Sequence, residues 1–416
     1  MKEIQIIGLG YVGLPLALLC DKKGLKVKGY DIDKDKIKSI LNKIVTVDDV
    51  TISSHVKNHN LTVNHNIEPA DVHIICVPTP IDRNKHPDIS IIKSVTRELV
   101  HVIKDNDLII IESTIYPGLC NEEIVPILNK SNKTYLLAHC PERINPGDKK
   151  FGIQNINRIV GGINKDSVKA AYEIYSQIID AKVMQLNSIK SAEATKILEN
   201  IFRDVNIALV NEMAQAFYRM DIDTIEVIKA ASTKPFSFLP HYPGVGVGGH
   251  CIAIDPYYMI EKGKASGFDH EFLTLARKIN EYMPIYSVNL LQNTLNLHAR
   301  TCISVEKIGI YGLSYKSNIG DDRESPSYQV IKKLKEEKGA NVYKFDPYLI
   351  IKSDYKTVED FLKNITCLMI CTSHSEILEV DWRKYPNLKV IIDGRNCIKS
   401  ESMEQTNIIY KGIGVN

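Results

Sequence analysis

The sequence predicts an α/β protein in which two Rossmann-like, doubly wound domains are joined by a long central helical domain. Three observations predict this architecture: a glycine-rich turn between a strand and a helix near the start, long helical periodicity near the middle, and renewed strand–helix alternation from residue 306 onward. A chain of 416 residues can form two or three domains that each bury a core. We expect domains at residues 1–185, 186–300 and 301–416.

The composition restricts the classes of function. Lys plus Arg number 52 and Asp plus Glu number 50, so the charge balance favours neither nucleic acid nor a membrane as a partner. The nine cysteines include no CxxC pair and no zinc-ligand spacing, and we expect no metal site. With no signal-peptide pattern and no apolar run near the length of a bilayer span, we expect a cytoplasmic protein.

The first domain opens with a strand at residues 3–7, the motif GLGYVG at 8–13, an apolar helix at 14–22 and a strand at 26–30 that leads into Asp31. A GxGxxG motif alone is a weak signal. Here the strand, the motif, the helix and an acid about 20 residues later follow the order of dinucleotide-binding folds. The sequence therefore predicts a dinucleotide site, with a nucleotide-free Rossmann-like fold as the alternative.

Each glycine of this motif has its own expected role. Gly8 permits the tight turn, Gly10 lets the backbone approach a pyrophosphate, and Gly13 allows the helix to pack closely on the strand. Asp31 would accept hydrogen bonds from the adenosine ribose and repel a 2′-phosphate, so NAD is favoured over NADP. Within this part of the chain, the expected cofactor contacts are Gly8, Gly10, Tyr11, Val12, Gly13 and Asp31.

Further strands are expected at residues 72–77, 108–114 and 135–139. Ligands bind at the carboxyl ends of parallel strands. Thr79 and Thr114 are therefore placed to touch a cofactor or substrate, and the turn with Glu142 and Arg143 brings an acid and a guanidinium to the same edge. Plain turns at the ends of strands are the alternative.

Residues 191–220 show long helical periodicity, with apolar side chains mostly three or four positions apart. A helix of this length between two α/β halves suits a dimer-forming element, and we expect a homodimer. Lys196 and Asn200 are four positions apart and share a face, and Arg203 lies on the same side. A solvated helix face is the alternative explanation of this polar stripe.

Residues 243–258 form a loop with four glycines among residues 244–249. The backbone of such a loop can approach a ligand closely. This loop carries the thiol of Cys251 and, four residues later, the carboxylate of Asp255. A nucleophile on a glycine-rich loop indicates an active site, although a buried structural cysteine beside a turn is the alternative.

A second α/β unit begins with a strand at residues 306–312 and continues through strands at 342–346, 366–371 and 389–393. The complete glycine fingerprint is missing from this unit. We therefore expect it to cover a ligand rather than to bind a second dinucleotide.

Seven ordered motifs resemble the UDP-glucose/GDP-mannose dehydrogenase family over essentially the whole chain. They are GLGYVG at 8–13, VPTP at 77–80, ESTIYPG at 112–118, CPERINPG at 140–147, EATKILENIFRDVNIALVNE at 193–212, GVGVGGHCIAIDPYY at 244–258 and YGLSYKSNIGDDRESPS at 311–327. The resemblance implies an enzyme that oxidises the C6 hydroxymethyl group of a nucleotide-bound sugar to a carboxylate and uses two NAD per turnover.

The resemblance also implies catalytic roles. Cys251 would form a thiohemiacetal with the intermediate aldehyde, and oxidation would give a thioester that water cleaves. Lys196 and Asn200 would stabilise the oxyanions that develop at C6. Either Glu142 or Asp255 would activate the water. The water would be oriented by Thr114, and the choice between the two acids stays open.

Other residues are assigned to binding by the same resemblance. Gly246 and Gly248 would lie against the nucleotide-sugar, and Phe236 would form the wall on the uridine side. Lys316 would contact the substrate and Arg323 the NAD, with ordinary surface charges as the alternative. The expected substrate contacts are Glu142, Arg143, Lys196, Asn200, Arg203, Phe236, Gly246, Gly248 and Lys316.

Three features bear on the identity of the sugar. Pro146 stands where the simple UDP-glucose dehydrogenases carry a second glutamate, and the RDVN run from Arg203 is similar to the branch that acts on UDP-N-acetylhexosamines. The Arg203 guanidinium would donate to the acetamido carbonyl. The KPF and PHYPG segments, from residue 234 to 244, favour UDP-N-acetylglucosamine, while UDP-N-acetylmannosamine and then UDP-glucose stay open.

Two other classes of protein are alternatives. A silent sensor of NAD or of a nucleotide-sugar would keep the fold without the chemistry. A two-electron NAD dehydrogenase would share the first domain but would have no use for a cysteine on a GGHC loop. The thiol, the lysine and the acids favour the four-electron enzyme.

Overall fold

The computed structural model describes residues 2–45, 47, 49, 51–82, 84–144, 148 and 150–415. The chain forms two compact units. The N-terminal unit comprises Met1–Glu199 with Tyr257–Asp269, and the C-terminal unit comprises Asn200–Pro256 with His270–Asn416. These units do not test the division into three domains, which stays a prediction.

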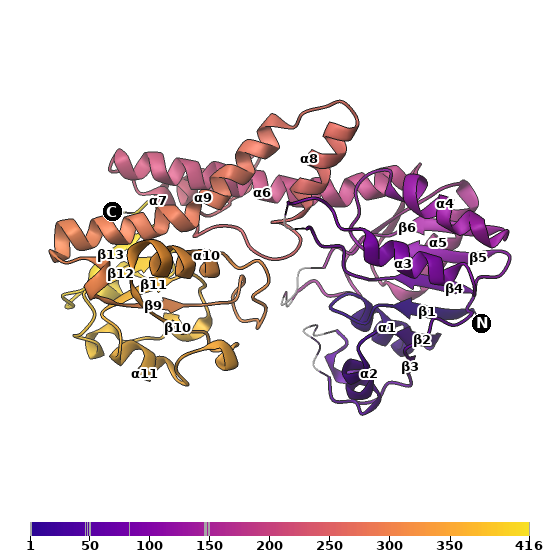
Figure 1. Cartoon of the computed structure of the whole chain (residues 1–416), viewed down its shortest axis with the longest axis horizontal. Helices are drawn as coiled ribbons and strands as arrows, with labels where there is room; N and C mark the ends of the chain where they lie inside the picture. The colour runs from indigo at the N-terminus through magenta and orange to yellow at the C-terminus, as the bar shows by residue number, and fades with distance from the viewer. Residues whose placement is uncertain are drawn as a thin grey trace. The chain divides into compact units, whose positions relative to one another are not determined.

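The N-terminal unit contains an eight-stranded sheet with the strand order β3-β2-β1-β4-β5-β6-β7-β8 (Figure 1). Neighbouring strands are parallel except for β6 and β7, which are antiparallel. The strands are β1 (Glu3–Ile7), β2 (Lys26–Tyr30), β3 (Thr62–Asn64), β4 (Val72–Ile75), β5 (Asp107–Ile111), β6 (Tyr135–His139), β7 (Arg158–Gly162) and β8 (Val183–Gln185). The first six have the order of dinucleotide-binding Rossmann sheets.

Helices cover both faces of this sheet, so its strands are apolar on both sides. Ile4 and Ile6 of β1 contribute to one buried core, and Ile7 contributes to the other because side chains alternate along a strand. The helices are α1 (Gly13–Lys22), α2 (Lys34–Leu41), α3 (Ser90–Leu99), α4 (Val125–Leu128) and α5 (Lys165–Ile178), with single turns η1 (Ser53–His55), η2 (Cys120–Ile124) and η3 (Asn129–Ser131).

The chain passes from one unit to the other at three points, two of which lie inside helices and the third between Asp269 and His270. The two helices are α6 (Ile189–Arg219), which has 31 residues, and α8 (Asp255–Ala265). The C-terminal unit adds α7 (Thr224–Ala231) and α9 (Glu271–Thr294). Within the described part of the chain, no helix is both long enough and apolar enough to cross a membrane.

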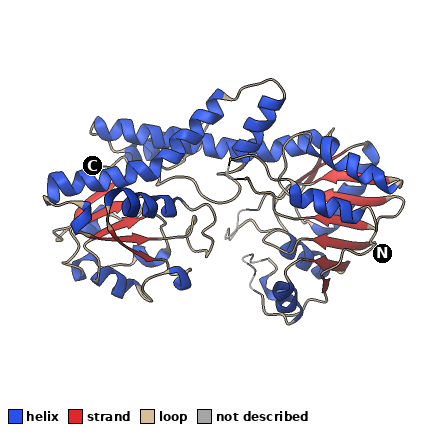
Figure 2. Cartoon of the chain, in the orientation of Figure 1, coloured by secondary structure: helices blue, strands red, loops and turns tan. Residues whose placement is uncertain are grey.

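The C-terminal unit contains a five-stranded parallel sheet with the order β10-β9-β11-β12-β13. Figure 2 shows helices beside each of the two sheets. The strands are β9 (Lys307–Tyr311), β10 (Asn341–Phe345), β11 (Cys367–Ile370), β12 (Val390–Asp393) and β13 (Ile409–Gly412). The helices are α10 (Pro326–Lys332), α11 (Val358–Lys363) and α12 (Ser375–Leu378), with single turns η4 (Leu295–Ala299), η5 (Ile303–Val305), η6 (Lys333–Glu337), η7 (Ile350–Lys352), η8 (Trp382–Lys384) and η9 (Ser400–Met403). The predicted fold class, two Rossmann-like sheets and a long central helix, is confirmed.

Candidate active site

The glycine turn between β1 and α1 is closely packed at two positions and open at a third. Gly8 has a φ of +92°, and a Cβ there would lie 2.9 Å from the Cys76 carbonyl oxygen. A Cβ on Gly13 would lie 1.8 Å from the Gly8 carbonyl oxygen. Around Gly10, by contrast, no described atom would come within 4 Å of a Cβ. This open backbone at the start of a helix fits a pyrophosphate. Of the other expected contacts in the turn, Tyr11 is 58% exposed and Val12 is the N-cap of α1.

Asp31 ties the end of β2 to this turn. Its Oδ2 accepts hydrogen bonds from the Leu9 backbone amide and from Lys36 Nζ, each at 2.9 Å, and its Oδ1 accepts one from the Asp33 amide at 2.9 Å. The carboxylate is 5% exposed. A carboxylate oxygen can accept two hydrogen bonds, so Oδ1 retains an acceptor position for a ribose hydroxyl. The hydrogen bond from Lys36 to Asp31 was not predicted from the sequence.

The ends of β4 and β5 are joined by threonines. Thr79 Oγ1 donates to the backbone carbonyl of Thr114 at 2.7 Å, and the Tyr258 hydroxyl donates to the carbonyl of Thr79 at 2.6 Å. The structure therefore brings the two predicted threonines together at the carboxyl edge of the sheet.

Glu142, which follows β6, lies beside Lys196 of α6, with 4.0 Å between its Oε2 and the lysine Nζ. Burial raises the pKa of Glu142, and the positive charge of Lys196 opposes that rise. The second carboxylate oxygen is buried and has no hydrogen-bond partner among the described residues. A buried, partly compensated acid is a good candidate for accepting a proton.

A buried polar cluster that the sequence analysis missed lies next to this acid. Arg158 and Glu112 form a fully buried ion pair at 3.0 Å, and the Tyr175 hydroxyl donates to Glu112 at 2.5 Å. Arg158 also donates to the Pro141 carbonyl at 3.3 Å, and the Glu142 amide donates to the Glu112 carbonyl at 3.4 Å. The cluster therefore supports the backbone that carries Glu142.

The guanidinium of Arg143 forms an ion pair and a hydrogen bond within the N-terminal unit. It pairs with Glu199 of α6, with Nη2 to Oε1 at 2.6 Å and Nε to Oε2 at 3.2 Å, and it donates to the Asn157 carbonyl at 3.0 Å. Glu199 was not among the expected residues. Its spacing of three from Lys196 is the signal that could have identified it, because such residues share a helix face.

In the C-terminal unit, Asn200 of α6 donates from Nδ2 to Asp255 Oδ2 at 2.5 Å. The carbonyl of Cys251 accepts hydrogen bonds from the amides of Ile254 at 3.1 Å and of Asp255 at 2.8 Å, which forms the turn that starts α8. The Cys251 residue is half-buried. The predicted amide donor, acid and thiol thus belong to one locally bonded arrangement.

The glycine loop before Cys251 is anchored by a buried relay of side chains. The Gly244 amide donates to Asn211 Oδ1 at 2.9 Å, and Asn211 Nδ2 donates to Asn280 Oδ1 at 2.9 Å. Asn280 Nδ2 in turn donates to Asp204 Oδ1 at 2.8 Å, and Arg277 pairs with that carboxylate at 2.6 Å. None of these four side chains was predicted, because their partners lie far apart in the sequence.

The loop with Lys316 and Arg323 packs on the cysteine loop. The Gly249 amide donates to the Arg323 carbonyl at 3.1 Å, and a Cβ on Gly248 would lie 2.7 Å from the Tyr315 Cβ. The Arg323 side chain pairs with Asp321, with Nη2 to Oδ2 at 2.5 Å. Two blocks more than 60 residues apart in the sequence therefore form one surface.

The remaining expected contacts of the C-terminal unit differ in exposure, since Gly246 is buried whereas Arg203 and Phe236 are exposed. Gly246 has a φ of +132°, and its Cβ would lie 3.0 Å from Pro326. Arg203 is exposed on α6, and Phe236 is 65% exposed with the Lys234 ammonium 4.9 Å from its ring centre. Pro146 lies outside the described residues.

Three family models match successive parts of the chain. They are described as the NAD binding domain, the central domain and the UDP binding domain of the UDP-glucose/GDP-mannose dehydrogenase family, and they match residues 2–179, 190–282 and 309–400.

Individual relatives match most of the chain. A UDP-N-acetyl-D-mannosamine dehydrogenase of Methanococcus maripaludis is 34% identical over 100% of this chain and 97% of its own length. A UDP-N-acetyl-D-glucosamine 6-dehydrogenase of Pseudomonas aeruginosa is 37% identical over 84% of each chain. Among solved structures, the UDP-D-ManNAc dehydrogenase of Pyrococcus horikoshii has a TM-score of 0.91 and 32% identity over 99% of both chains.

Proposed function

Because the chain belongs to the UDP-glucose/GDP-mannose dehydrogenase family, and is therefore an NAD-dependent UDP-sugar dehydrogenase, we propose that it oxidises the C6 hydroxyl of a UDP-N-acetylhexosamine to a carboxylate. The observation that carries this proposal is the bonded arrangement of Cys251, Asn200 and Asp255, because it combines a thiol with an amide donor and an acid. A two-electron dehydrogenase would not need such a thiol.

The glycine turn of the N-terminal unit fits NAD. The backbone at Gly10 is open to a ligand, and Asp31 retains an acceptor position toward the ribose. When it is bound, NAD supplies the hydride acceptor for both oxidations. The acid at the end of β2 would also repel the 2′-phosphate of NADP.

Cys251 is the proposed nucleophile. Its sulfur would add to the C6 aldehyde to form a thiohemiacetal, whose two-electron oxidation gives a thioester. Water then cleaves the thioester, which releases the carboxylate and restores the thiol. Lys196 and the amide of Asn200 would stabilise the negative charge on the C6 oxygen.

We assign the activation of water to Glu142 rather than to Asp255. Asp255 Oδ2 already accepts the amide of Asn200, whereas one oxygen of Glu142 has no hydrogen-bond partner among the described residues. The raised pKa of Glu142 also brings it closer to neutrality, where a general base works best. Asp255 would orient the Asn200 amide, and Thr114 would orient the water.

The proposal covers two C2 epimers of the sugar. The KPF and PHYPG segments favour UDP-N-acetylglucosamine. Several relatives that match nearly the whole chain at 33–35% identity are named for UDP-N-acetylmannosamine. In either case we propose that exposed Arg203 contacts the acetamido group, and that Phe236, Gly246, Gly248 and Lys316 contact the nucleotide-sugar.

We also propose that two copies of the chain associate through the central helices. In the C-terminal unit, α6 exposes Phe202 (50%) and Leu209 (54%), which are seven residues apart, and α9 exposes Phe272 (67%) and Leu275 (54%). Exposed apolar side chains that recur along one helix, as at this seven-residue spacing, are candidates for burial between two copies. Light scattering after size-exclusion chromatography would test this, with Leu209→Asp expected to give a monomer.

The test of the proposed function is an assay of purified protein with NAD and each of four sugars: UDP-N-acetylglucosamine, UDP-N-acetylmannosamine, UDP-N-acetylgalactosamine and UDP-glucose. NADH and product mass are followed together. The expected result is two NADH and one uronic acid per N-acetylhexosamine, and Cys251→Ser should bind the sugar without forming acid. Turnover of UDP-glucose alone would contradict the substrate class, and no turnover would support the silent sensor.

A further inference from the structure

The C-terminal unit repeats the opening turn of the N-terminal unit. Gly312 follows β9 with a φ of +87°, as Gly8 follows β1 with +92°. The amide of the next residue donates to an acid at the end of the neighbouring strand: to Asp31 at 2.9 Å in the first case and to Asp346 at 2.7 Å in the second. In the N-terminal unit this acid retains an acceptor position for a ligand.

The acid of the C-terminal unit is used differently. Asp346 is fully buried, and its Oδ2 also accepts hydrogen bonds from the Ser314 amide and hydroxyl at 2.8 Å and from His374 Nε2 at 3.1 Å. Its Oδ1 accepts one from the Tyr348 amide at 2.8 Å. Burial raises its pKa, but the donors outweigh burial and lower the pKa to about 2. Asp346 is therefore an ionised internal acceptor.

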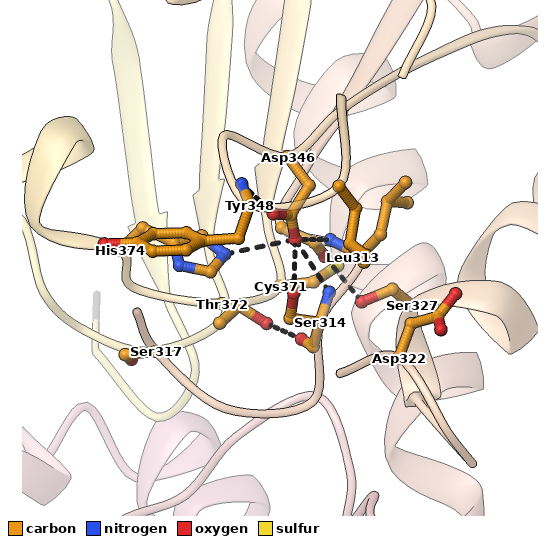
Figure 3. Close-up of polar contacts among 12 residues, drawn as sticks. Leu313, Ser314, Ser317, Asp322, Ser327, Asp346, Tyr348, Cys371, Thr372 and His374 are labelled. Atoms are coloured by element: carbon orange, nitrogen blue, oxygen red, sulfur yellow. Dashed lines mark hydrogen bonds and ion pairs between the residues drawn. The ribbon is translucent and has the colours of Figure 1, made fainter. Parts of the chain in front are cut away.

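His374 connects Asp346 to the backbone of Asn318, two residues after Lys316. Its Nδ1 accepts a hydrogen bond from the Asn318 amide at 2.9 Å, so the ring proton resides on Nε2, which donates to Asp346. The imidazole is fully buried, and the Tyr348 ring stacks on it at 5.0 Å (Figure 3). The ring is therefore fixed in both orientation and tautomer.

Together the Asp346 and His374 side chains hold both ends of a short arch, which comprises residues 313–318. Asp346 binds the amides of Leu313 and Ser314 before Lys316, and His374 binds the amide of Asn318 after it. Beyond the arch, the backbone of the same loop accepts the amide of Gly249 in the cysteine loop. The conformation of the arch thus affects the surface next to the glycine loop.

We propose that Asp346 and His374 are positioning residues that hold Lys316 in the conformation that receives the UDP-sugar. The inference rests on the proposed function, since it assigns Lys316 to the substrate. The pair acts through the arch and does not touch the ligand. The arch ends before Arg323, the residue expected to contact NAD, so the pair determines affinity for the UDP-sugar and leaves affinity for NAD nearly unchanged.

The test compares Asp346→Asn with Glu306→Gln. Glu306 is also a buried acid of this unit, 2% exposed, but it precedes β9 and bonds Thr301, Thr366 and Lys389 at the opposite end of the strands. Removing a charged hydrogen bond should raise the KM for the UDP-sugar, and the Kd for UDP by calorimetry, about ten-fold in Asp346→Asn only. The KM for NAD should stay within about two-fold, as expected for an interaction that NAD does not use.

His374→Gln is the second variant, and its amide can still donate to Asp346, so its effect should be intermediate between wild type and His374→Ala. Equal rises of KM for UDP-sugar in Asp346→Asn and Glu306→Gln, or unchanged UDP binding in Asp346→Asn and His374→Ala, would overturn the inference. Calorimetry separates it from the proposed function: a wild type that binds UDP but oxidises no sugar contradicts the function alone, and one that binds no UDP contradicts both.

Discussion

The side-chain amide of Asn200 donates to the carboxylate of Asp255 over 2.5 Å, which joins α6 to the first residue of α8. The acid thereby fixes the direction of the amide, and the second N–H of Asn200 can point to another acceptor. A donor held in this way is prepared to stabilise an oxyanion without reorganising during the reaction.

Replacement of this amide should reduce the rate of the chemistry. We expect Asn200→Ala to lower kcat by about 10² to 10³, as loss of one oxyanion donor does elsewhere, with little change in KM. Steady-state kinetics would measure both constants. Thr195→Ala is the matched control, because it removes a half-buried side chain whose hydroxyl donates to the Ser191 carbonyl on the same helix. A similar kcat for the two variants would contradict the assignment.

Two glycines of the first turn should respond differently to the same change. A methyl group on Gly10 meets no described atom within 4 Å, so Gly10→Ala should fold normally and weaken NAD binding about ten-fold by blocking the approach of the pyrophosphate. On Gly13 it would lie 1.8 Å from the Gly8 carbonyl, so Gly13→Ala should destabilise the unit. Thermal unfolding and NAD titration would separate these effects. Normal NAD affinity in Gly10→Ala would exclude close backbone contact there.

The pH dependence of the reaction rate should reflect the protonation of Glu142. Because burial raises its pKa, the carboxylate becomes protonated at a pH above the ordinary value of 4.5, and kcat, which includes the hydrolysis step, should fall as pH decreases through that raised value. Lys196 lowers this pKa, so Lys196→Met should move the acidic limb to still higher pH besides reducing the rate. An acidic limb that is unchanged in Lys196→Met would assign it to another group.

The buried ion pair between Arg158 of β7 and Glu112, which follows β5, should contribute to stability. Arg158→Met leaves Glu112 charged and without its cation in the interior, which should cost about 3–5 kcal/mol. Urea unfolding followed by circular dichroism would show a lower midpoint. Arg383→Met, which breaks an exposed pair with Asp381, should leave the midpoint unchanged. Equal midpoints for the two variants would mean that the buried pair is dispensable.

Local patterns were sufficient to predict the fold and the position of the main motifs. The strand, glycine turn and Asp31 obey short-range rules, and in the structure Asp31 accepts a hydrogen bond from the Leu9 amide of the turn. Lys196 and Glu142, 54 positions apart, came together because strand ends and a helix face constrain them. The family resemblance, and not spacing, connected Cys251 with Asn200.

The supporting residues could not be predicted in the same way. Glu112 and Arg158 are 46 positions apart, and Asp204 and Asn280 are 76 apart. Nothing in the local sequence of a buried polar residue identifies its partner, because satisfaction of its hydrogen bonds is decided by tertiary packing. The sequence shows that these residues are polar, but it does not show which residues they contact.

The internal use of Asp346 limits what can be engineered into the C-terminal sheet. Restoring the missing glycines after Gly312 would copy the outline of a dinucleotide-binding turn, but Asp346, the acid that should receive a ribose, is fully buried, and four donors surround one of its oxygens. A grafted coenzyme site would therefore require removal of His374 and Ser314 as well. Those substitutions would remove bonds that hold the arch around Lys316. A second coenzyme site could therefore be introduced only at the expense of the proposed contact between Lys316 and the UDP-sugar.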